Sequence, residues 1–305
     1  MRVLVLGGNG FIGSHLVDSL LIAGHQVRVF DRSPEKYRKP LKGVDYRLAS
    51  FDDIACLAEA LDGIDIVYHL ISTTVPSTSN KNPIFDVESN LINTIRLLDL
   101  MKDMNVKKII YLSSGGTVYG IPEQVPIPET HSLNPICSYG IVKVAIENYI
   151  KMYHHLYGLN YSILRVSNPY GERQGHTGVQ GVIATFMGKV HRDETIEIWG
   201  DGSIVRDFIY VGDLIELCLK VSKSDSIGVF NAGIGKGLSI NNIVKLLSES
   251  SGKDIEVSYA SNRNYDVPQV VLNINKTKDV FDWSPKIGFH DGFKITWNWM
   301  VGVNS

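Results

Sequence analysis

The stretch VLVLGGNGFIGS, residues 3–14, decides the fold of this chain. A short apolar run leads into it, and apolar residues at helical spacing follow it. Glycines between a strand and a helix permit a tight turn, a close approach of a pyrophosphate to the backbone, and close packing of the helix on the strand. The stretch therefore predicts a dinucleotide-binding turn built on Gly7, Gly10 and Gly13, with Gly8 in place of Gly7 as the alternative spacing.

The residues around this turn extend the predicted dinucleotide site. Phe11 and Ile12 begin the helix whose free N–H groups face the phosphates, and Leu70 ends a later strand. Asp31 ends the second strand, where a carboxylate accepts hydrogen bonds from the adenosine ribose. Because that carboxylate repels a 2′-phosphate, it favours NAD over NADP, although the neighbouring Arg32 is a cation that can help to hold NADP. A structural turn with a solvated aspartate is the alternative interpretation.

The order of elements predicts the fold class. Up to about residue 168, short β-rich apolar runs alternate with longer segments of helical spacing, as in an α/β doubly wound Rossmann fold with a parallel sheet. We expect strands at 2–6, 26–30, 64–70, 107–112 and 160–166, and helices before Gly24 and over 83–104. We therefore expect residues 1–168 to form an NAD-binding domain, to which some later segments return, and 169–305 to form a smaller C-terminal substrate-binding region.

Composition excludes several classes of function. The 305 residues are 44% hydrophobic and 20% charged, and 30 Lys and Arg oppose 32 Asp and Glu, so no basic field for nucleic acid exists. No apolar run approaches the roughly 20 residues of a membrane span. Cys56, Cys137 and Cys218 stand far apart and form no metal or redox motif. We therefore expect no metal site and a reducing, cytoplasmic location.

A tyrosine and a lysine form the candidate catalytic pair. Tyr139 and Lys143, in SYGIVK (138–143), stand four apart at the start of a predicted helix, so their side chains share one face about 6 Å apart. A phenol is a poor base at neutral pH, but an adjacent ammonium and a nicotinamide cation lower its pKa. The pair could then take a proton from a sugar hydroxyl. From spacing alone, two solvated helix residues remain the alternative.

Five motifs stand in a fixed order along the chain. The glycine turn is followed by SSGGTVYG (113–120), SYGIVK (138–143), NPYG (168–171) and VRDFIYVGDL (205–214). Through them the chain resembles the nucleotide-sugar epimerase/dehydratase family of extended short-chain dehydrogenases/reductases over nearly its whole length. Within that family it looks closest to the UDP-glucose (UDP-galactose) 4-epimerases and their UDP-N-acetylglucosamine relatives. The resemblance implies a Rossmann fold, bound NAD and a nucleotide-sugar substrate.

The resemblance also assigns roles, with one departure from the family pattern. Tyr139 matches the base, Lys143 the residue that binds the nicotinamide ribose, and Asn90, in ESNLINT (88–94), a cofactor-proximal asparagine. The hydroxyl residue that usually bonds the reacting oxygen of the substrate falls on Gly115. We expect its role to pass to one of two nearby hydroxyls, with the first preferred: Thr117 or Ser114.

The matching positions further along the chain suggest a nucleotide-sugar site. Arg206 and Arg263 match arginines that clamp the diphosphate, because a guanidinium pairs bidentately with phosphate oxygens, and Asn168 matches an asparagine near that group. Val270 matches the position where a bulky tyrosine in some 4-epimerases blocks an N-acetyl group. A valine there leaves room for UDP-N-acetylhexosamines.

These features predict reversible inversion at carbon 4 of a UDP-hexose or UDP-N-acetylhexosamine through a transient 4-keto sugar. Dehydration is disfavoured, because the 4,6-dehydratases place an Asp-Glu pair where this chain has Gly116 and Thr117. An NAD(P)H-dependent reductase of a dTDP-4-keto-6-deoxy-hexose is the second enzyme hypothesis. A non-catalytic dinucleotide-binding sensor or scaffold, suggested by the glycine at 115, is the hypothesis from another class.

The resemblance further implies a homodimer that serves polysaccharide biosynthesis. Dimers in this family pair the helices that correspond to 83–104 and 139–157 here. On the second helix, we expect Ile150, Met152 and Tyr153 to be exposed apolar residues that could form such an interface.

Overall fold

A computed structural model describes residues 1–175, 181–261 and 267–304. The chain divides into two compact units, each assembled from three segments. Unit 1 comprises Met1–Gly120, Ser132–Val166 and Ile215–Phe230, and unit 2 comprises Ile121–His131, Ser167–Leu214 and Asn231–Ser305. Within the described ranges, no helix combines the length and the apolar character that crossing a membrane requires.

Unit 1 is built on a seven-stranded sheet in the order β10-β6-β5-β4-β1-β2-β3. All the strand pairs from β6 to β3 are parallel, which confirms the expected doubly wound Rossmann fold. The strands are β1 (Arg2–Leu6), β2 (Gln26–Asp31), β3 (Val44–Leu48), β4 (Ile66–His69), β5 (Lys108–Ser114), β6 (Asn160–Val166) and β10 (Gly228–Ala232). Two of them, β3 and β10, are absent from the strands expected from the sequence.

Helices cover both faces of this sheet. Successive side chains of a strand point to opposite sides, so one strand contributes to the packing on each face. Leu4 and Leu6 of β1 join a core with the helices α2 (Ile54–Leu61), α5 (Asn93–Asp103) and α6 (Ser138–Tyr157). On β4, the Tyr68 hydroxyl donates a 2.9 Å hydrogen bond to the carbonyl of Cys218, on α8 (Val211–Lys223). The central strands therefore have apolar residues at successive positions rather than at every second position.

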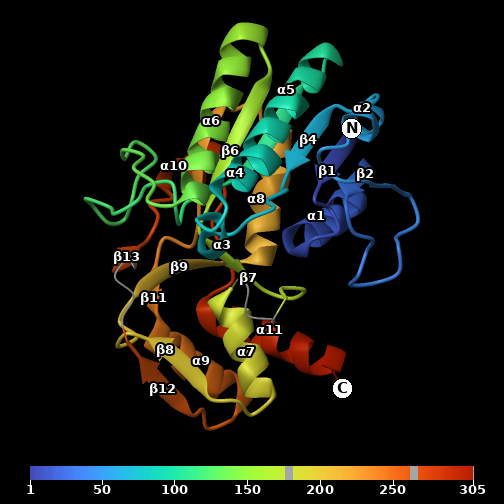
Figure 1. Ribbon diagram of the computed structural model, residues 1–305. Helices are drawn as coiled ribbons and strands as arrows, with labels where there is room; N and C mark the ends of the chain where they lie inside the picture. Colours follow the sequence, from blue (N-terminus) through green and yellow to red (C-terminus); the bar gives the residue numbers. More distant parts are fainter. Residues whose placement is uncertain (176–180, 262–266, 305) are drawn as a thin grey trace. The chain divides into compact units, whose positions relative to one another are not determined.

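The helix expected over 83–104 is a continuous run of three helical segments, two α-helical and one π-helical. It consists of α4 (Pro83–Asp86), the π-helical segment η1 (Val87–Ile92) and α5, and α5 lies beside α6 (Figure 1). The expectation that Ile150 and Tyr153 of α6 are exposed is wrong. Ile150 packs in the core, and Tyr153 is buried while its hydroxyl donates to Asp99 of α5 at 2.7 Å. Met152 is exposed.

Unit 2 is organised around β9 (Val205–Tyr210), which pairs with β7, β11 and β13. A separate parallel pair joins β8 to β12. Its core combines aliphatic residues with five buried aromatic ones, Tyr170, Phe186, Phe208, Phe293 and Trp297. The remaining elements are α3 (Pro76–Ser79) and α1 (Phe11–Ile22) in unit 1, and β7 (Asn168–Tyr170), α7 (Val182–His191), β8 (Ile196–Trp199), β11 (Gly237–Ser239), α9 (Ile240–Ser251), β12 (Val257–Ala260), β13 (Gln269–Val270), α10 (Asn275–Phe281) and α11 (Phe289–Asn304) in unit 2.

A buried aspartate fixes the centre of unit 2. Asp207 of β9 is fully buried and accepts backbone N–H bonds from Ile234 (2.9 Å), Gly235 (3.1 Å) and Leu272 (3.2 Å). Burial raises the pKa of this carboxyl to about 6, while the three N–H groups oppose that rise. The bonds hold β9, and so its neighbour Arg206, against the turn after β10 and the segment after β13.

Candidate active site

Each glycine of the first turn has its own structural reason. Gly7 has φ +83°, a left-handed conformation that favours glycine. Gly10 precedes α1, and a Cβ built on it would meet only the Gly7 carbonyl oxygen, at 3.2 Å. A Cβ on Gly13 would collide with that oxygen and lie 2.7 Å from the Cα of Gly8. The turn therefore needs Gly13 for helix packing and Gly10 for an unobstructed face.

A cavity of about 830 Å³ lies beside this turn. Of the residues predicted to hold the cofactor, Gly7, Gly10, Asp31, Arg32 and Leu70 border it. The volume is in the range of cofactor sites, and Gly10 at its border is the N-cap of α1, where free N–H groups attract phosphate. The residues present therefore suit a dinucleotide.

Asp31 is held in place by the glycine turn itself. Its carboxylate accepts hydrogen bonds from the backbone N–H of Asn9 (3.1 Å) and of Ser33 (3.0 Å). The Asn9 side chain, which is buried, also donates to the Ser33 carbonyl at 2.7 Å. Phe11 and Ile12 are the first residues of α1, and neither is among the residues that border the cavity.

The structure brings Tyr139 and Lys143 together at the start of α6. The Lys143 ammonium lies 5.5 Å from the centre of the Tyr139 ring and donates a 3.0 Å bond to the Leu112 carbonyl at the end of β5. The Tyr139 N–H in turn donates to the Ser79 hydroxyl at 3.1 Å, which fixes the first turn of the helix. The pair therefore sits on a rigid element.

Burial moves both pKa values of the pair. It raises the pKa of Tyr139 to about 12, against a lowering hydrogen bond to the Ser72 hydroxyl. It lowers the pKa of Lys143 to about 8, against the carboxylates of Glu147 and Asp86, which raise it. With a pKa of about 12, the phenol is protonated at neutral pH. An added positive charge is therefore what the phenol needs to act as a base.

The 113–119 segment, from the end of β5 to Tyr119, carries the two candidate hydroxyls. The Thr117 Oγ1 is buried and has no hydrogen-bond partner among the described residues. The backbone N–H of Thr117 donates to the Ser114 carbonyl at 3.3 Å, and that of Gly115 donates to the Val166 carbonyl at 2.7 Å. A buried hydroxyl without a partner is costly unless a ligand satisfies it, which favours Thr117 over Ser114.

Asn90 is buried, and its side chain forms hydrogen bonds with other residues of the protein. It is buried in η1, where its Oδ1 accepts from the Thr73 N–H at 2.9 Å. Its Nδ2 donates to the Thr73 hydroxyl (2.8 Å) and to the Asp86 carboxylate (2.9 Å). Because Thr73 borders the 830 Å³ cavity, Asn90 fixes one wall of that cavity.

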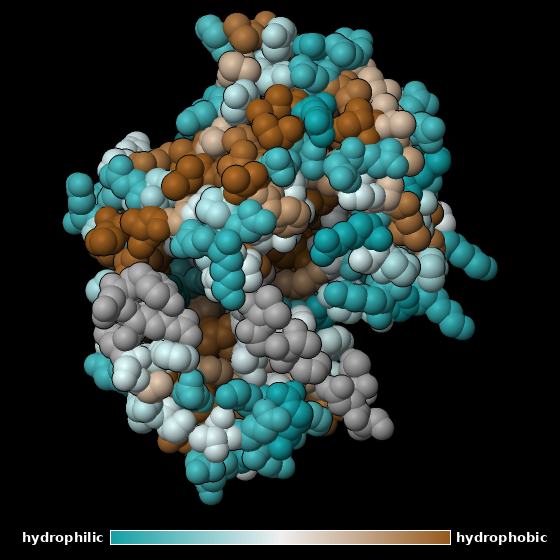
Figure 2. Space-filling model, in the orientation of Figure 1, coloured by the Kyte–Doolittle hydropathy of each residue, from teal (hydrophilic) through white to brown (hydrophobic). Residues whose placement is uncertain are grey.

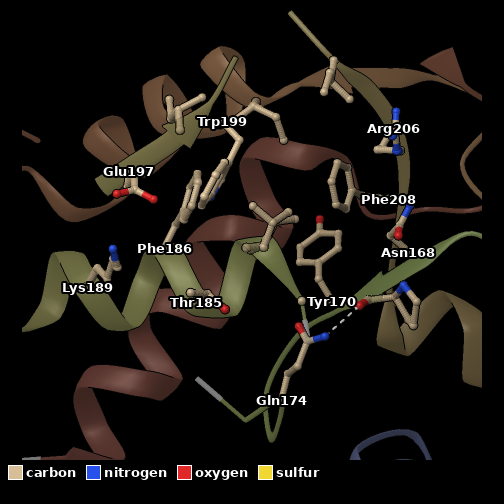
Figure 3. A pocket seen from close by; sticks show the side chains of 17 residues that line it. Asn168, Tyr170, Gln174, Thr185, Phe186, Lys189, Glu197, Trp199, Arg206 and Phe208 are labelled. Carbon is tan, nitrogen blue, oxygen red and sulfur yellow. Dashed lines mark hydrogen bonds between the residues drawn. The ribbon is translucent and has the colours of Figure 1, made fainter. Parts of the chain in front are cut away.

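Unit 2 has a pocket of its own, of about 460 Å³, drawn in Figure 3. It is bordered by Asn168 from β7, Phe186 from α7, Trp199 from β8 and Arg206 from β9. The Asn168 amide donates to the Asp207 carbonyl at 2.9 Å. Aromatic walls with one guanidinium and a few polar groups suit a planar base with an anionic tail.

The other two residues predicted to bind the substrate lie elsewhere. Arg263 is outside the described residues. Val270 is on β13, in register with Arg206 of β9, and is 4% exposed. It is not among the residues that border the 460 Å³ pocket, so its role toward an N-acetyl group stays a prediction.

Comparison with known proteins identifies the family. Residues 3–233 match the model of the NAD dependent epimerase/dehydratase family. The chain belongs to this family. It is 35% identical to a protein named putative UDP-glucose 4-epimerase of Methanocaldococcus jannaschii, over 99% of both chains. These matches confirm the resemblance that the five motifs suggest.

Solved structures of family members agree. The UDP-glucose 4-epimerase of Thermotoga maritima, solved with UDP-glucose, superposes with a TM-score of 0.96 at 36% identity over 100% of both chains. The UDP-N-acetylglucosamine 4-epimerase of Methanobrevibacter ruminantium, solved with UDP-N-acetylmuramic acid, gives 0.93 at 31% identity, covering 99% of this chain and 98% of its own. This family member is an enzyme with NAD as its cofactor, as the sequence predicts.

Several residues that border the 830 Å³ cavity are not apparent from the motifs. The cavity is also bordered by Ser50 and Asp52 after β3, by Ser72 after β4, and by Ser89 and Arg96 on the helical run after it. Short-range patterns could not assign them, because they meet only in the folded sheet. Among residues 1–175, 181–261 and 267–304, no group of three or more His, Cys, Asp and Glu could hold a metal ion.

For this family member, we expect Lys143→Met to stabilise the NAD-free protein at neutral pH while removing its activity. A folded-state pKa of about 8 against an ordinary 10.5 means that the buried ammonium costs about 3 kcal/mol at pH 7. Losing the bond to Leu112 removes about 1 kcal/mol of stabilisation. The net gain should be on the order of 1–2 kcal/mol, seen as a higher Tm.

The sign of this effect can be checked against pH. The lysine pKa is depressed in the folded state, so its cost is full below about pH 8 and is lost as the pH rises toward 10.5. The Tm difference between variant and wild type should therefore shrink between these values. Lys39→Met, at an exposed position, serves as the control and should leave Tm unchanged at both ends. A lower Tm for Lys143→Met at pH 7 contradicts the prediction.

Proposed function

We propose that this protein interconverts the C4 epimers of a UDP-hexose or UDP-N-acetylhexosamine through a transient 4-keto sugar. The arrangement of Tyr139 and Lys143 on the first turns of α6 carries this proposal, with the buried Thr117 hydroxyl as the third member. The two structural relatives named above are 4-epimerases of UDP-glucose and UDP-N-acetylglucosamine, which supports the same two substrate classes for this chain.

The residues divide the chemistry between them. Tyr139 takes the proton of the C4 hydroxyl, and the Lys143 ammonium stabilises the phenolate form that does so. The Thr117 hydroxyl donates a hydrogen bond to the same sugar oxygen as its charge grows. Bound NAD supplies a reversible acceptor for the hydride of C4. The same hydride would return to C4 on the other face of the 4-keto sugar while Tyr139 returns the proton to the oxygen, so that no net oxidation occurs.

Unit 2 supplies the nucleotide-binding half. We assign the 460 Å³ pocket to the nucleotide, with its aromatic walls, Phe186 and Trp199, for the base and ribose. Arg206 and Asn168 suit the diphosphate, and Arg263 is proposed for the same role on the family pattern. Binding energy from the nucleotide part of the substrate orients the sugar without taking part in the reaction.

Incubation of the purified protein with UDP-galactose or UDP-N-acetylgalactosamine tests the function. Proton NMR should show the 4-epimer of at least one of the two sugars appearing, with NAD required only in catalytic amount. If both sugars remain unaltered, the proposal fails. Stoichiometric oxidation of NAD(P)H with a dTDP-4-keto-6-deoxy-hexose would instead establish the reductase hypothesis. Inactivity toward all three substrates would favour a sensor or scaffold.

Thr117 and Ser114 can be separated by substitution. We expect Thr117→Val to lower kcat about 10²-fold, because one hydrogen-bond donor to the developing oxyanion is lost while the shape is kept. Thr117→Ser should retain most of the activity, and Ser114→Ala should stay within about threefold of wild type. Steady-state kinetics on the epimerised sugar measures all three. A larger loss in Ser114→Ala than in Thr117→Val would transfer the role to Ser114.

We further propose a homodimer that pairs α5 and α6 with their copies. Figure 2 shows brown, hydrophobic areas interspersed with teal ones over the part of unit 1 that contains these helices. Exposed apolar side chains on α6 and on the helical run before α5 contribute to this character: Ile84, Val87, Ile92, Ile141, Met152 and Leu156. The three cysteines are free, which supports the proposed cytoplasmic location, and a place in polysaccharide biosynthesis stays a prediction.

A further inference from the structure

A buried ion pair in unit 1 joins α6, one turn after Lys143, to the strand β6. Glu147 follows Lys143 by one turn of α6, and Arg165 is on β6. The guanidinium forms a bidentate ion pair with the carboxylate, in which Nη2 donates to Oε2 at 2.7 Å and Nε donates to Oε1 at 3.0 Å. The two side chains are 0% and 3% exposed. Desolvation offsets most of the attraction in such a pair, so stability alone explains its presence poorly.

The pair reaches both ends of the 113–119 segment. The Ser113 hydroxyl donates to the Glu147 carboxylate at 2.6 Å. At the other end, Arg165 Nη1 donates to the Tyr119 hydroxyl at 3.1 Å, and its guanidinium lies 5.0 Å from the centre of the Tyr119 ring. The candidate hydroxyl of Thr117 lies between these two attachments.

A third contact fixes the middle of the segment against the same helix. A Cβ on Gly140, the residue after Tyr139, would lie 2.9 Å from the Thr117 carbonyl oxygen. Glycine thus lets Thr117 approach the backbone of α6 beside the catalytic tyrosine. The helix that carries Tyr139 and Lys143 therefore also contacts this segment at its middle and at Ser113, while Arg165 of β6 holds the Tyr119 end.

We propose that Glu147 and Arg165 are positioning residues that set the Thr117 hydroxyl relative to Tyr139. The proposal rests on the proposed function, since both groups must address one sugar oxygen. A hydroxyl misplaced by about 1 Å can cost about 10²-fold in rate without changing substrate affinity. An ion pair with two rigid partners limits that error better than single hydrogen bonds do.

The first test cuts the attachments and keeps the ion pair. In the Ser113→Ala/Tyr119→Phe double variant, Glu147 and Arg165 remain paired, so Tm should stay near that of the wild type. We expect kcat to fall by about 10–100-fold. KM for the UDP-sugar should change less than about twofold, because we assign nucleotide binding to unit 2. A purely structural ion pair predicts no change in kcat.

The second test removes the charges and keeps the volume. Replacing both partners of a buried ion pair by apolar residues is often neutral for stability, whereas removing one is not. The Glu147→Leu/Arg165→Met double variant should therefore fold and bind NAD, yet show a loss of kcat similar to that of the first variant. Asp45→Asn is the matched control, since it neutralises the carboxylate of the Arg28–Asp45 pair in the same sheet and should leave kcat unchanged.

Hydrogen exchange provides a readout that does not need activity. Backbone amides of residues 115–118 should exchange faster in both double variants, whereas those of 108–112 in β5 should not. If the wild-type protein lacks epimerase activity but exchange changes in this way, the proposed function fails and the attachment of the segment stands. If the wild type is active and both folded double variants keep kcat within about twofold, the positioning role is overturned, whatever their exchange rates.

Discussion

Tyr139→Phe is expected to lower kcat for C4 epimerisation by about 10³-fold. The substitution removes the only atom of this side chain that can exchange a proton, while the ring that lies 5.5 Å from the Lys143 ammonium stays in place. The affinity for NAD and the KM for the UDP-sugar should change little, because the cofactor cavity and the pocket of unit 2 are intact. The loss therefore falls on the chemical step.

Tyr149→Phe is the matched control for this experiment. It removes a hydroxyl from the same helix, ten residues further along, and should leave kcat within about twofold of wild type. Initial rates for both variants, measured at saturating UDP-sugar by NMR, decide the point. A Tyr139→Phe variant with a tenth or more of the wild-type rate would show that another group serves as the base.

Gly13→Ala is the second change with a large expected effect, and it acts on the cofactor. The added Cβ would overlap the Gly7 carbonyl oxygen and approach the Gly8 Cα to 2.7 Å. Both obstacles are backbone atoms, so α1 must move away from β1. We expect the NAD site to open, with loss of co-purified NAD and a destabilisation of at least about 2–3 kcal/mol.

Gly288→Ala provides the comparison, because no atom lies within 4 Å of a Cβ built there. It should keep both the Tm and the NAD content of the wild type. The NAD content is measured by releasing nucleotides from the purified proteins and then identifying and quantifying them by mass spectrometry. Retention of NAD at the wild-type level in Gly13→Ala would mean that the helix can shift without disturbing the turn.

Local patterns were sufficient for much of unit 1. The run before Gly7 and the glycine spacing predict β1 and α1, because turn geometry and periodicity act over a few residues. The strand β3 escapes the same reasoning, since VDYRL is a half-exposed edge strand with few apolar residues. The strand β10 is missed for another reason. It joins the sheet of unit 1 at the edge opposite β3, but in the sequence it comes after two segments of unit 2, outside the alternating pattern of residues 1–168.

The site divides along the same line. The spacing of Tyr139 and Lys143 places them together, as a helix requires, and the structure shows the contact. The partners of Glu147, by contrast, come from two different strands, and no pattern within a short window indicates them. The choice between Thr117 and Ser114 also depends on burial, which only the folded segment reveals.

The interleaving of the two units has a consequence for synthesis on the ribosome. The sheet of unit 1 lacks its β10 edge until residues 228–232 have emerged, by which time residues 167–214 of unit 2 are already outside. Until then β6 presents unpaired backbone groups, a template for wrong pairing. We infer that no single truncation of the gene yields either unit as a complete fragment. Any chain that ends before residue 232 leaves the β6 edge unpaired and should aggregate.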